Sequence, residues 1–419
     1  MQNLKARPRF RTVRFGKDPE KINFVPGMLR RGMHLRTWRE AICERSLEWV
    51  RTEIYRTNRN ADTYIINSKV IPMKNLSKTI LALAAVCGLH VAARAQNPDL
   101  VVAPGVPGCY NTINEAVQAA PERSEKPVII LIKNGIYREK VIIDRPRICL
   151  VGEDRDSTRI IFPELSSKRT IREFKGRPVG NGVVVLMEGA DDCLLTRMTI
   201  YNNYGSTVEP TTAHQMAVFG RATRTIIVNC NVWADGNDDV SLWAPGGNGM
   251  YYHADCDFRC PGVDFVCPRG WCYVTRCRFR GNGPAQIWHD GRGDESKKLV
   301  ITDSRFDADS PCILGRYHHD SQFYLLNCTL TDKIVDHEIG YAYSDKVLDV
   351  LEWGNRVYMY NVKRDGGNYK WMKDNLQEAK GAPKPEDITP AWTFAGKWDP
   401  EAEVEALWPL IGYEKQRVN

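Results

Sequence analysis

Short apolar stretches of strand length recur along the chain from about residue 96 to residue 362. The first three are Pro127–Lys133, Tyr137–Ile143 and Ile148–Gly152, and Asn134–Gly135 forms a turn signal between the first two. Apolar residues with a period near 3.6 precede them, from Ile113 to Ala120. The pattern therefore predicts a mostly β structure that begins with one short amphipathic helix.

The later apolar stretches resemble one another. They begin at Cys193, Thr225, Met250, Cys272, Leu299, Phe323 and, more faintly, Val357. One equivalent position, at intervals of 32, 26, 21, 27, 24 and 34 residues, holds Met198, Cys230, Cys256, Cys277, Ser304, Cys328 and Val362. A repeat in the low twenties that loops lengthen is typical of a parallel β-helix, whose stacked coils share one core. An antiparallel β-sandwich is the alternative, but its strands need not resemble each other.

The pattern changes after Val362. Tyr369–Lys380 and Glu401–Leu410 are predicted helices, and a Pro-rich segment separates them. We therefore expect residues 96–362 to form one β-helical domain. Residues 363–419 would form a cap of helices and loops that covers exposed strand edges or packs along the solenoid.

Residues 73–95 are typical of a secretory signal peptide. Lys74 and Lys78 provide a basic start, Thr79–Ala93 is apolar, and Ala93–Ala95 offers small residues for cleavage before Gln96. The apolar run is shorter than a membrane span. The segment predicts a secreted protein, periplasmic or extracellular, that is not held in a membrane after cleavage.

Residues 1–72 do not fit this arrangement, because a signal peptide works at the N-terminus of a chain. The segment is Arg-rich and lacks a sustained apolar period. We interpret it as an upstream extension that is not native and is disordered or poorly packed. The alternative is a basic prodomain in which Thr79–Ala93 is a buried helix.

Charge is distributed unevenly and argues against nucleic-acid binding. The net charge of the chain is +7, but residues 1–95 hold 19 Lys and Arg against 7 Asp and Glu. The remaining residues hold 39 against 44. The main body is mildly acidic and has no basic footprint for DNA or RNA.

Thirteen cysteines would suggest disulfides in a secreted chain, and eleven of them follow residue 96. The repeat favours another interpretation for Cys230, Cys256, Cys277 and Cys328. Residues at one coil position stack as an inward column of small apolar side chains, so these thiols are predicted to be free and buried. A Cys260–Cys267 disulfide stays open.

Two acids and an arginine, Asp239, Asp264 and Arg316, lie beside strand-like stretches between His214 and Cys328. Such residues could act as a general acid/base, a carboxylate nucleophile and the cation that keeps the nucleophile ionised. Trios of this kind are usually structural. The spacing therefore points to a site only together with the periodic chain around it and with the motifs below.

Several motifs, in one order, resemble those of the pectin methylesterases, also called pectinesterases or carbohydrate esterase family 8. They are Tyr110–Ile113, Gly135–Glu139, Gln215–Val218, Asp238–Val240, Val263–Val266 and Leu314–Arg316. No single motif is specific, but their order is. The resemblance implies a right-handed parallel β-helix of the pectin-lyase-like type, in agreement with the repeat.

The resemblance also implies roles for individual residues. Asp264 would be the nucleophile, Asp239 the general acid/base, and Arg316 the partner of Asp264. Gln215 would donate to the oxyanion. Asp238 stands where the family has a second oxyanion glutamine, so the chain departs from the family there.

Substrate-binding residues follow from the resemblance less directly. The family has a tryptophan after its arginine motif that stacks on the substrate, and Tyr317 and His318 stand at this place. Trp243 and Trp288 are further candidates for stacking on sugar rings, although core packing is an equally common use of tryptophan in such folds.

The implied activity is hydrolysis of methyl esters in pectin, a homogalacturonan, to pectate and methanol. It would need no metal or cofactor, and we expect a monomer that binds methyl-esterified pectin. Two alternatives stay open: a β-helical pectate or rhamnogalacturonan lyase with a Ca²⁺ site, and a non-catalytic pectin-binding paralogue. Metal binding by His289, His318 and His319 is disfavoured, because acidic partners at ligand spacing are absent.

Overall fold

A computed structural model describes residues 63–66, 69–72, 98–281, 284–292, 294–319, 321–341 and 356–411. The chain divides into two compact units, Met1–Ala92 and Ala93–Asn419. In the first unit, β1 (Thr63–Ile66) and β2 (Lys69–Pro72) pair antiparallel. The rest of the predicted extension and the predicted signal peptide lie outside the described residues. No helix in the described ranges is long and apolar enough to cross a membrane.

Three parallel sheets build the second unit. The ten-stranded sheet contains β3 (Leu100–Val102), β4 (Val128–Ile132), β7 (Ile148–Gly152), β12 (Leu194–Thr196), β15 (Thr225–Val228), β18 (Gly249–Ala254), β21 (Gly270–Thr275), β24 (Lys298–Thr302), β27 (Gln322–Leu326) and β30 (Arg356–Tyr360). The nine-stranded sheet contains β5 (Gly135–Tyr137), β8 (Thr158–Ile161), β13 (Thr199–Asn202), β16 (Asn231–Ala234), β19 (Asp257–Cys260), β22 (Arg278–Gly281), β25 (Arg305–Ala308), β28 (Thr329–Leu330) and β31 (Lys363–Arg364). The eight-stranded sheet contains β6 (Val141–Ile143), β11 (Val184–Leu186), β14 (Val218–Gly220), β17 (Val240–Leu242), β20 (Val266–Pro268), β23 (Ala285–Asp290), β26 (Ile313–His319) and β29 (Gly340–Tyr341).

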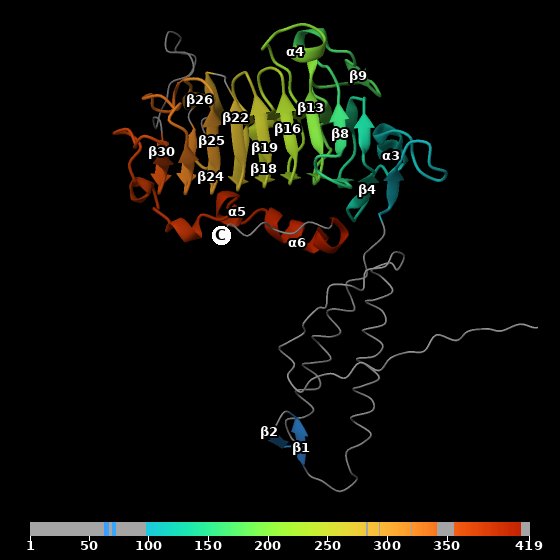
Figure 1. Cartoon of the computed structure of the whole chain (residues 1–419), viewed down its shortest axis with the longest axis horizontal. Helices are drawn as coiled ribbons and strands as arrows, with labels where there is room; N and C mark the ends of the chain where they lie inside the picture. The colour runs from blue at the N-terminus through green and yellow to red at the C-terminus, as the bar shows by residue number, and fades with distance from the viewer. Residues whose placement is uncertain are drawn as a thin grey trace, which may run out of the picture. The chain divides into compact units, whose positions relative to one another are not determined.

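Each coil passes through the three sheets in turn, as β11, β12 and β13 do. Successive coils pair in parallel register, for example Val184 with Val218 and Leu194 with Ile226. Figure 1 shows the coils of this unit stacked side by side between β4 and β30. The arrangement confirms the predicted parallel β-helix.

Each repeated segment is two strands separated by a corner, rather than one strand. In the segment from Cys193, Arg197 lies between β12 and β13 with φ of 59°. The corresponding corner residues, with φ between 50° and 55°, are Asn229, Asp255, Arg276, Asp303, Asn327 and Asn361. Asn and Asp adopt this left-handed conformation more readily than most residues. The corner residue explains the repeated polar residue that precedes each cysteine or its equivalent.

The predicted inward column follows directly after these corners. Its members are at most 4% exposed: Met198, Cys230, Cys256, Cys277, Ser304, Cys328 and Val362. The thiols of the four cysteines in this column bond to backbone carbonyls, as when Cys256 Sγ donates to Ile227 O at 3.4 Å. All eleven cysteines of the described chain are free. The prediction of free, buried thiols is confirmed, and the Cys260–Cys267 disulfide does not form.

Helix α3 (Ile113–Ala119) is the predicted amphipathic helix. Thr112 and Glu115 form a capping box at its start. Its buried residues join the core cluster of the solenoid. The remaining short elements before the last coils are η1 (Ser166–Lys168), β9 (Glu173–Phe174), β10 (Arg177–Pro178), α4 (Tyr204–Thr207) and η2 (Pro245–Gly247).

The C-terminal tail lies along the outer face of the ten-stranded sheet (Figure 1). It contains η3 (Leu376–Glu378), η4 (Pro385–Asp387), α5 (Pro390–Thr393) and α6 (Pro400–Ile411). Phe394 and Trp398 pack there with Tyr252 and Tyr273 of the sheet. The predicted helix over Tyr369–Lys380 is wrong, because that segment consists of turns, bends and irregular backbone around the short η3. The tail therefore covers a side of the solenoid.

Candidate active site

Two aspartates lie at the same level of neighbouring coils. β17 and β20 pair Val240 with Val266, so Asp238 and Asp264, each two residues earlier, are equivalent. Both have a left-handed backbone, with φ of 68° and 64°. One oxygen of each carboxylate and the sulfur of Cys267 lie within 4.8 Å of one another. Coil stacking thus brings together two acids that are far apart in sequence.

Arg316 on β26 forms a two-pronged ion pair with Asp264. Its Nε and Nη2 donate to the two carboxylate oxygens at 3.2 and 2.7 Å. Burial raises the pKa of Asp264 to about 6, while the arginine pulls it downward. Arg316 therefore favours the ionised carboxylate, as expected, but burial outweighs it.

His214 is the partner of the second acid. Its Nδ1 lies 2.9 Å from Asp238 Oδ2, and 55% of its side chain is exposed. The hydrogen bond to Asp238 raises the pKa of His214. No role was predicted for this residue from the sequence. The one available signal was its position directly before the Gln215–Val218 motif.

Asp239 faces the interior of the solenoid. Ala217 and Phe265 occupy its coil position in the adjacent coils, and both belong to the buried core. Asp239 is fully buried, and neither of its carboxylate oxygens has a hydrogen-bond partner among the described residues. Burial raises its pKa well above the usual range. The structure thus places Asp238, rather than Asp239, beside Asp264, which corrects the assignment made from the motif.

Gln215 is fully buried next to the site. Its Oε1 accepts from Gly205 N at 2.9 Å, and its Nε2 donates to Thr211 O at 2.7 Å. Both ends of the amide therefore bind the loop that contains α4. This geometry does not direct the amide toward Asp264, as an oxyanion donor would require.

Asn237 offers a second carboxamide beside the two acids. Its Oδ1 accepts from Val263 N at 3.0 Å, which ties together the residues that precede Asp238 and Asp264. Gly262 is needed at this contact, because a Cβ there would lie 2.1 Å from Asn237 Oδ1. Since the oxygen faces a donor, the Nδ2 group is the part of this amide left to donate toward a substrate.

The predicted substrate-binding residues differ in how deeply they are buried and in what they contact. Trp243 is partly buried, and its Nε1 donates to Cys267 O at 2.9 Å, next to the acids. Trp288 is 4% exposed and packs edge-on against His318, with ring centroids 5.2 Å apart. Tyr317 is also 4% exposed and belongs to the core cluster, so neither its ring nor that of Trp288 is available for stacking on a sugar.

Asp238, Asp264 and Cys267 form the one cluster of potential metal ligands found in the described part of the chain. Arg316 already binds both oxygens of Asp264. Burial raises the pKa of the Cys267 thiol, whose sulfur donates to Asp264 O at 3.2 Å. The contacts therefore favour an ion-paired carboxylate over a metal ligand. His289 is fully buried and bonds to a backbone carbonyl.

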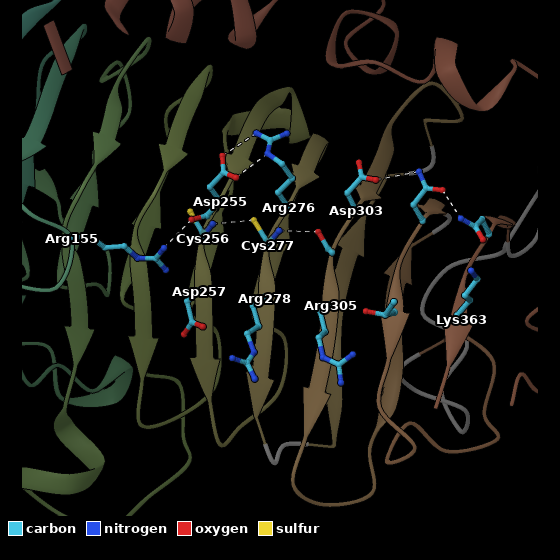
Figure 2. Close-up of a pocket in the computed structure, with 14 residues that line it drawn as sticks. Arg155, Asp255, Cys256, Asp257, Arg276, Cys277, Arg278, Asp303, Arg305 and Lys363 are labelled. Carbon is cyan, nitrogen blue, oxygen red and sulfur yellow. Dashed lines mark hydrogen bonds and ion pairs between the residues drawn. The ribbon is translucent and has the colours of Figure 1, made fainter. Parts of the chain in front are cut away.

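A groove at the corner between the ten- and nine-stranded sheets is separate from this cluster (Figure 2). Several of its polar side chains bind residues on adjacent coils. Arg276 pairs with Asp255 at 2.8 Å, and Asn327 bonds to Asp303 at 3.2 Å. These contacts link neighbouring coils, and none of the predicted site residues lines the groove. Its residues therefore stabilise the stacking of the coils.

Comparisons with known proteins give a consistent result. The family model described as Pectinesterase matches residues 99–325. The probable pectinesterase/pectinesterase inhibitor 19 of Arabidopsis thaliana is 30% identical over 201 residues, 47% of this chain and 34% of the relative. Probable pectinesterase 56 of the same plant is 28% identical over 222 residues, 52% of this chain and 71% of the relative. The chain spans only about a third of the length of several such relatives.

Solved structures share the fold. A pectin methylesterase in complex with hexasaccharide VII aligns with a TM-score of 0.58 at 19% identity, over 73% of this chain and 99% of that one. The pectin methylesterase from carrot aligns with a TM-score of 0.56 at 21% identity, over 76% and 98% of the two chains. At these identities the likeness concerns the fold.

Proposed function

The chain belongs to the pectinesterase family, and we propose that it hydrolyses the methyl esters of pectin to pectate and methanol. One observation carries the proposal. Two carboxylates lie within 4.8 Å of each other on adjacent coils, and Arg316 binds one of them through two hydrogen bonds. The two acids therefore have different environments, which suits them to different catalytic roles, and both are close enough to act on one ester.

Asp264 acts as the nucleophile. Its ionised carboxylate attacks the ester carbonyl, and the tetrahedral intermediate collapses to an acyl-enzyme anhydride. Arg316 holds the carboxylate in place and favours its charged form. Because burial raises the pKa of Asp264 to about 6, the nucleophile is available once the pH exceeds that value.

Asp238 acts as the general acid and then as the general base. In its protonated form it gives a proton to the departing methoxide, which leaves as methanol. The resulting carboxylate takes a proton from water, and the hydroxide that forms cleaves the anhydride. Asp264 is then restored as a carboxylate, and the product is a free uronic acid. His214, whose Nδ1 lies 2.9 Å from Asp238 Oδ2, holds this carboxyl group in position.

Asn237 donates to the oxyanion in this proposal. Its carboxamide is fixed through Val263 N, and it is adjacent to Asp238 in the chain. Gln215 has a supporting role, because its bonds to Gly205 N and Thr211 O hold the loop that contains α4 beside the site. A preorganised donor of this kind contributes roughly 3–4 kcal/mol to the stabilisation of a developing oxyanion.

Secretion and a monomeric state are further parts of the proposal. Residues 73–95 support export, since their sequence has the features of a signal peptide. N-terminal sequencing of the exported protein would test this point. A first residue near Gln96 is expected, and a first residue before 73 would contradict it.

Methanol release from highly esterified pectin tests the activity. We expect the purified protein to release methanol and Asp264→Asn to lose nearly all of the rate while it still binds pectin. Asp365→Asn is the matched control, because that side chain is 62% exposed and far from the acids in sequence. Binding without methanol release would favour a non-catalytic paralogue. An unsaturated product that disappears with chelator would favour a lyase.

A further inference from the structure

The outer face of the nine-stranded sheet is basic. Side chains alternate along each strand, so Phe258, Phe279 and Phe306 point into the core, where they stack on one another. The outward positions of the same sheet hold six bases, Arg159, Arg259, Arg278, Arg280, Arg305 and Lys363, against two acids, Asp257 and Asp307. Residues 96–419 hold more acids than bases, so this face differs in charge from the main body as a whole.

The pairing of the coils places some of these side chains in one row across the strands. Asp257 pairs with Arg278, and Arg278 pairs with Arg305. Thr329 and Lys363 continue the row on the next two strands. We call these five residues the outer row; they line the groove described above, and Figure 2 shows four of them side by side. Because neighbouring strands are about 4.8 Å apart, the cations recur at short, regular intervals.

Acidic neighbours neutralise only part of this charge. Arg278 Nε and Arg305 Nε lie 2.6 and 2.7 Å from the two oxygens of one carboxylate, that of Asp307. Arg305 also lies 3.4 Å from Asp365, but both side chains of this pair are largely exposed, and such pairs are weak. Each guanidinium has five N–H donors, and the side chains of Arg278 and Arg305 are about half exposed. Donors therefore remain for an anion from solution.

Aromatic rings lie at one end of the same face. Tyr201 and Trp233 pair on adjacent strands, and their ring centroids are 6.2 Å apart. The Trp233 Nε1 group donates to Asp257 Oδ1 at 3.0 Å, and the Arg259 guanidinium carbon lies 5.9 Å from the Trp233 ring. Both rings are only partly buried. An aromatic ring offers a surface to the apolar face of a sugar, so the neighbourhood suits a chain of sugar acids.

We propose that the outer row, with Trp233 at its end, is a non-catalytic binding surface for pectate. The choice of this ligand rests on the proposed function, which makes pectate the product. Pectate has a free carboxylate on each sugar, so a chain that crosses the strands meets one cation of the row after another. A fully methyl-esterified chain is neutral and lacks these contacts.

The consequence is attachment to pectin that has already been de-esterified. The outer row belongs to the nine-stranded sheet, whereas Arg316 and the strands that follow the two acids belong to the eight-stranded sheet. The protein can therefore remain bound to the product while its active site takes an ester from another chain.

Binding of polygalacturonate, which contains no ester, tests the surface. Arg278→Gln/Arg305→Gln should bind it about tenfold more weakly than the wild type, as expected for the loss of charge-assisted contacts. Lys373→Gln/Lys380→Gln is the matched control, because it removes the same charge from tail side chains that are 66% and 83% exposed. The control should bind as the wild type does. Unchanged affinity in the arginine variant, or an equal loss in the control, would overturn the proposal.

Kinetics separate the surface from the active site. Arg278→Gln/Arg305→Gln should keep kcat/KM for the methyl ester of trigalacturonic acid, which is too short to reach both places. The same variant should raise KM for long, partly esterified pectin without lowering kcat. Equal losses on the short and the long substrate would show a general structural defect and contradict the surface.

Two further variants test the row and its ring independently. Thr329→Glu places an acid between Arg305 and Lys363, so it should weaken polygalacturonate binding even if the arginine variant did not fold. Trp233→Leu should weaken the binding of polygalacturonate but not of polyglutamate, a polyanion without sugar rings. If polyglutamate competed as well as polygalacturonate of equal charge, the face would be a general polyanion surface, against the proposal.

Failure of this inference and failure of the proposed function are distinguishable. If the wild-type protein released no methanol from any pectin, the esterase function would fail, and the polygalacturonate comparison would still decide the surface. If methanol was released but Thr329→Glu and the arginine variant bound polygalacturonate normally, the surface alone would fail.

Discussion

Asp238 and Asp239 are adjacent acids, but replacing them should have opposite effects. A change at Asp238 should abolish most of the activity, whereas a change at Asp239 should stabilise the fold. Asp239→Leu replaces both unpartnered carboxylate oxygens with methyl groups of similar shape, at a position where neighbouring coils hold Ala217 and Phe265. A buried polar group without a partner costs about 1–3 kcal/mol. We therefore expect Asp239→Leu to raise the free energy of unfolding by about that amount, and to raise Tm by about 1–2 °C per kcal/mol, because the entropy of unfolding grows with the size of the unit.

The pH dependence sharpens this prediction. Burial raises the pKa of Asp239 in the folded protein, so the folded chain keeps a proton that the unfolded chain loses near the ordinary carboxyl pKa. Between these two pKa values, the wild-type protein loses about 1.4 kcal/mol of stability per pH unit as the pH rises. Asp239→Leu lacks this term, so its advantage over the wild type should grow with pH above about 4.

Denaturant unfolding from pH 4 to pH 8 measures the stability difference, and methanol release measures the activity. Asp239→Leu should retain activity. Asp238→Asn should lose a factor of about 10²–10⁴ in rate, which is typical for removal of a general acid/base. An Asp239→Leu protein that is folded but inactive, together with an active Asp238→Asn protein, would refute the reasoning and restore the assignment made from the sequence.

Three further predictions follow from the site and the core. The rate should rise as the pH rises through about 6, because Asp264 must lose its proton, and Arg316→Lys should lower the rate and move this limb to higher pH in a pH–rate profile. His214→Gln should slow methanol release and alter the pH–rate profile without changing the unfolding midpoint, since the ring is half-exposed; an unchanged profile would exclude a role for the ring. A thiol reagent should modify the native protein slowly and the unfolded protein quickly at Cys230, Cys256, Cys277 and Cys328, because all four are buried; rapid labelling of the native state would contradict the packing.

Sequence alone was sufficient for the solenoid and its inner column. Each coil buries one set of side chains against its neighbours, so equivalent positions carry similar residues, and the period between Met198 and Val362 records that constraint. The chemical type of the site was also predictable, since Asp264 and Arg316 come together as expected. The solenoid depends on spacing, which the sequence states directly, whereas the pairing of Asp264 with Arg316 was implied by the resemblance of the motifs.

Tertiary structure decided which acid faces the site and what surrounds it. Asp238 has φ of 68°, and this left-handed residue interrupts the alternation of sides along the strand, so the next residue, Asp239, points inward. Neither the sequence motif nor the repeat period indicates that Asp238 has this left-handed conformation. Likewise, the partnership of His214 with Asp238, the sharing of Asp290 by Arg269 and Arg292, and the docking of α6 on the ten-stranded sheet arise between coils. They depend on the register of the stacked coils. The loops between strands set that register, and the local sequence of one coil does not reveal it.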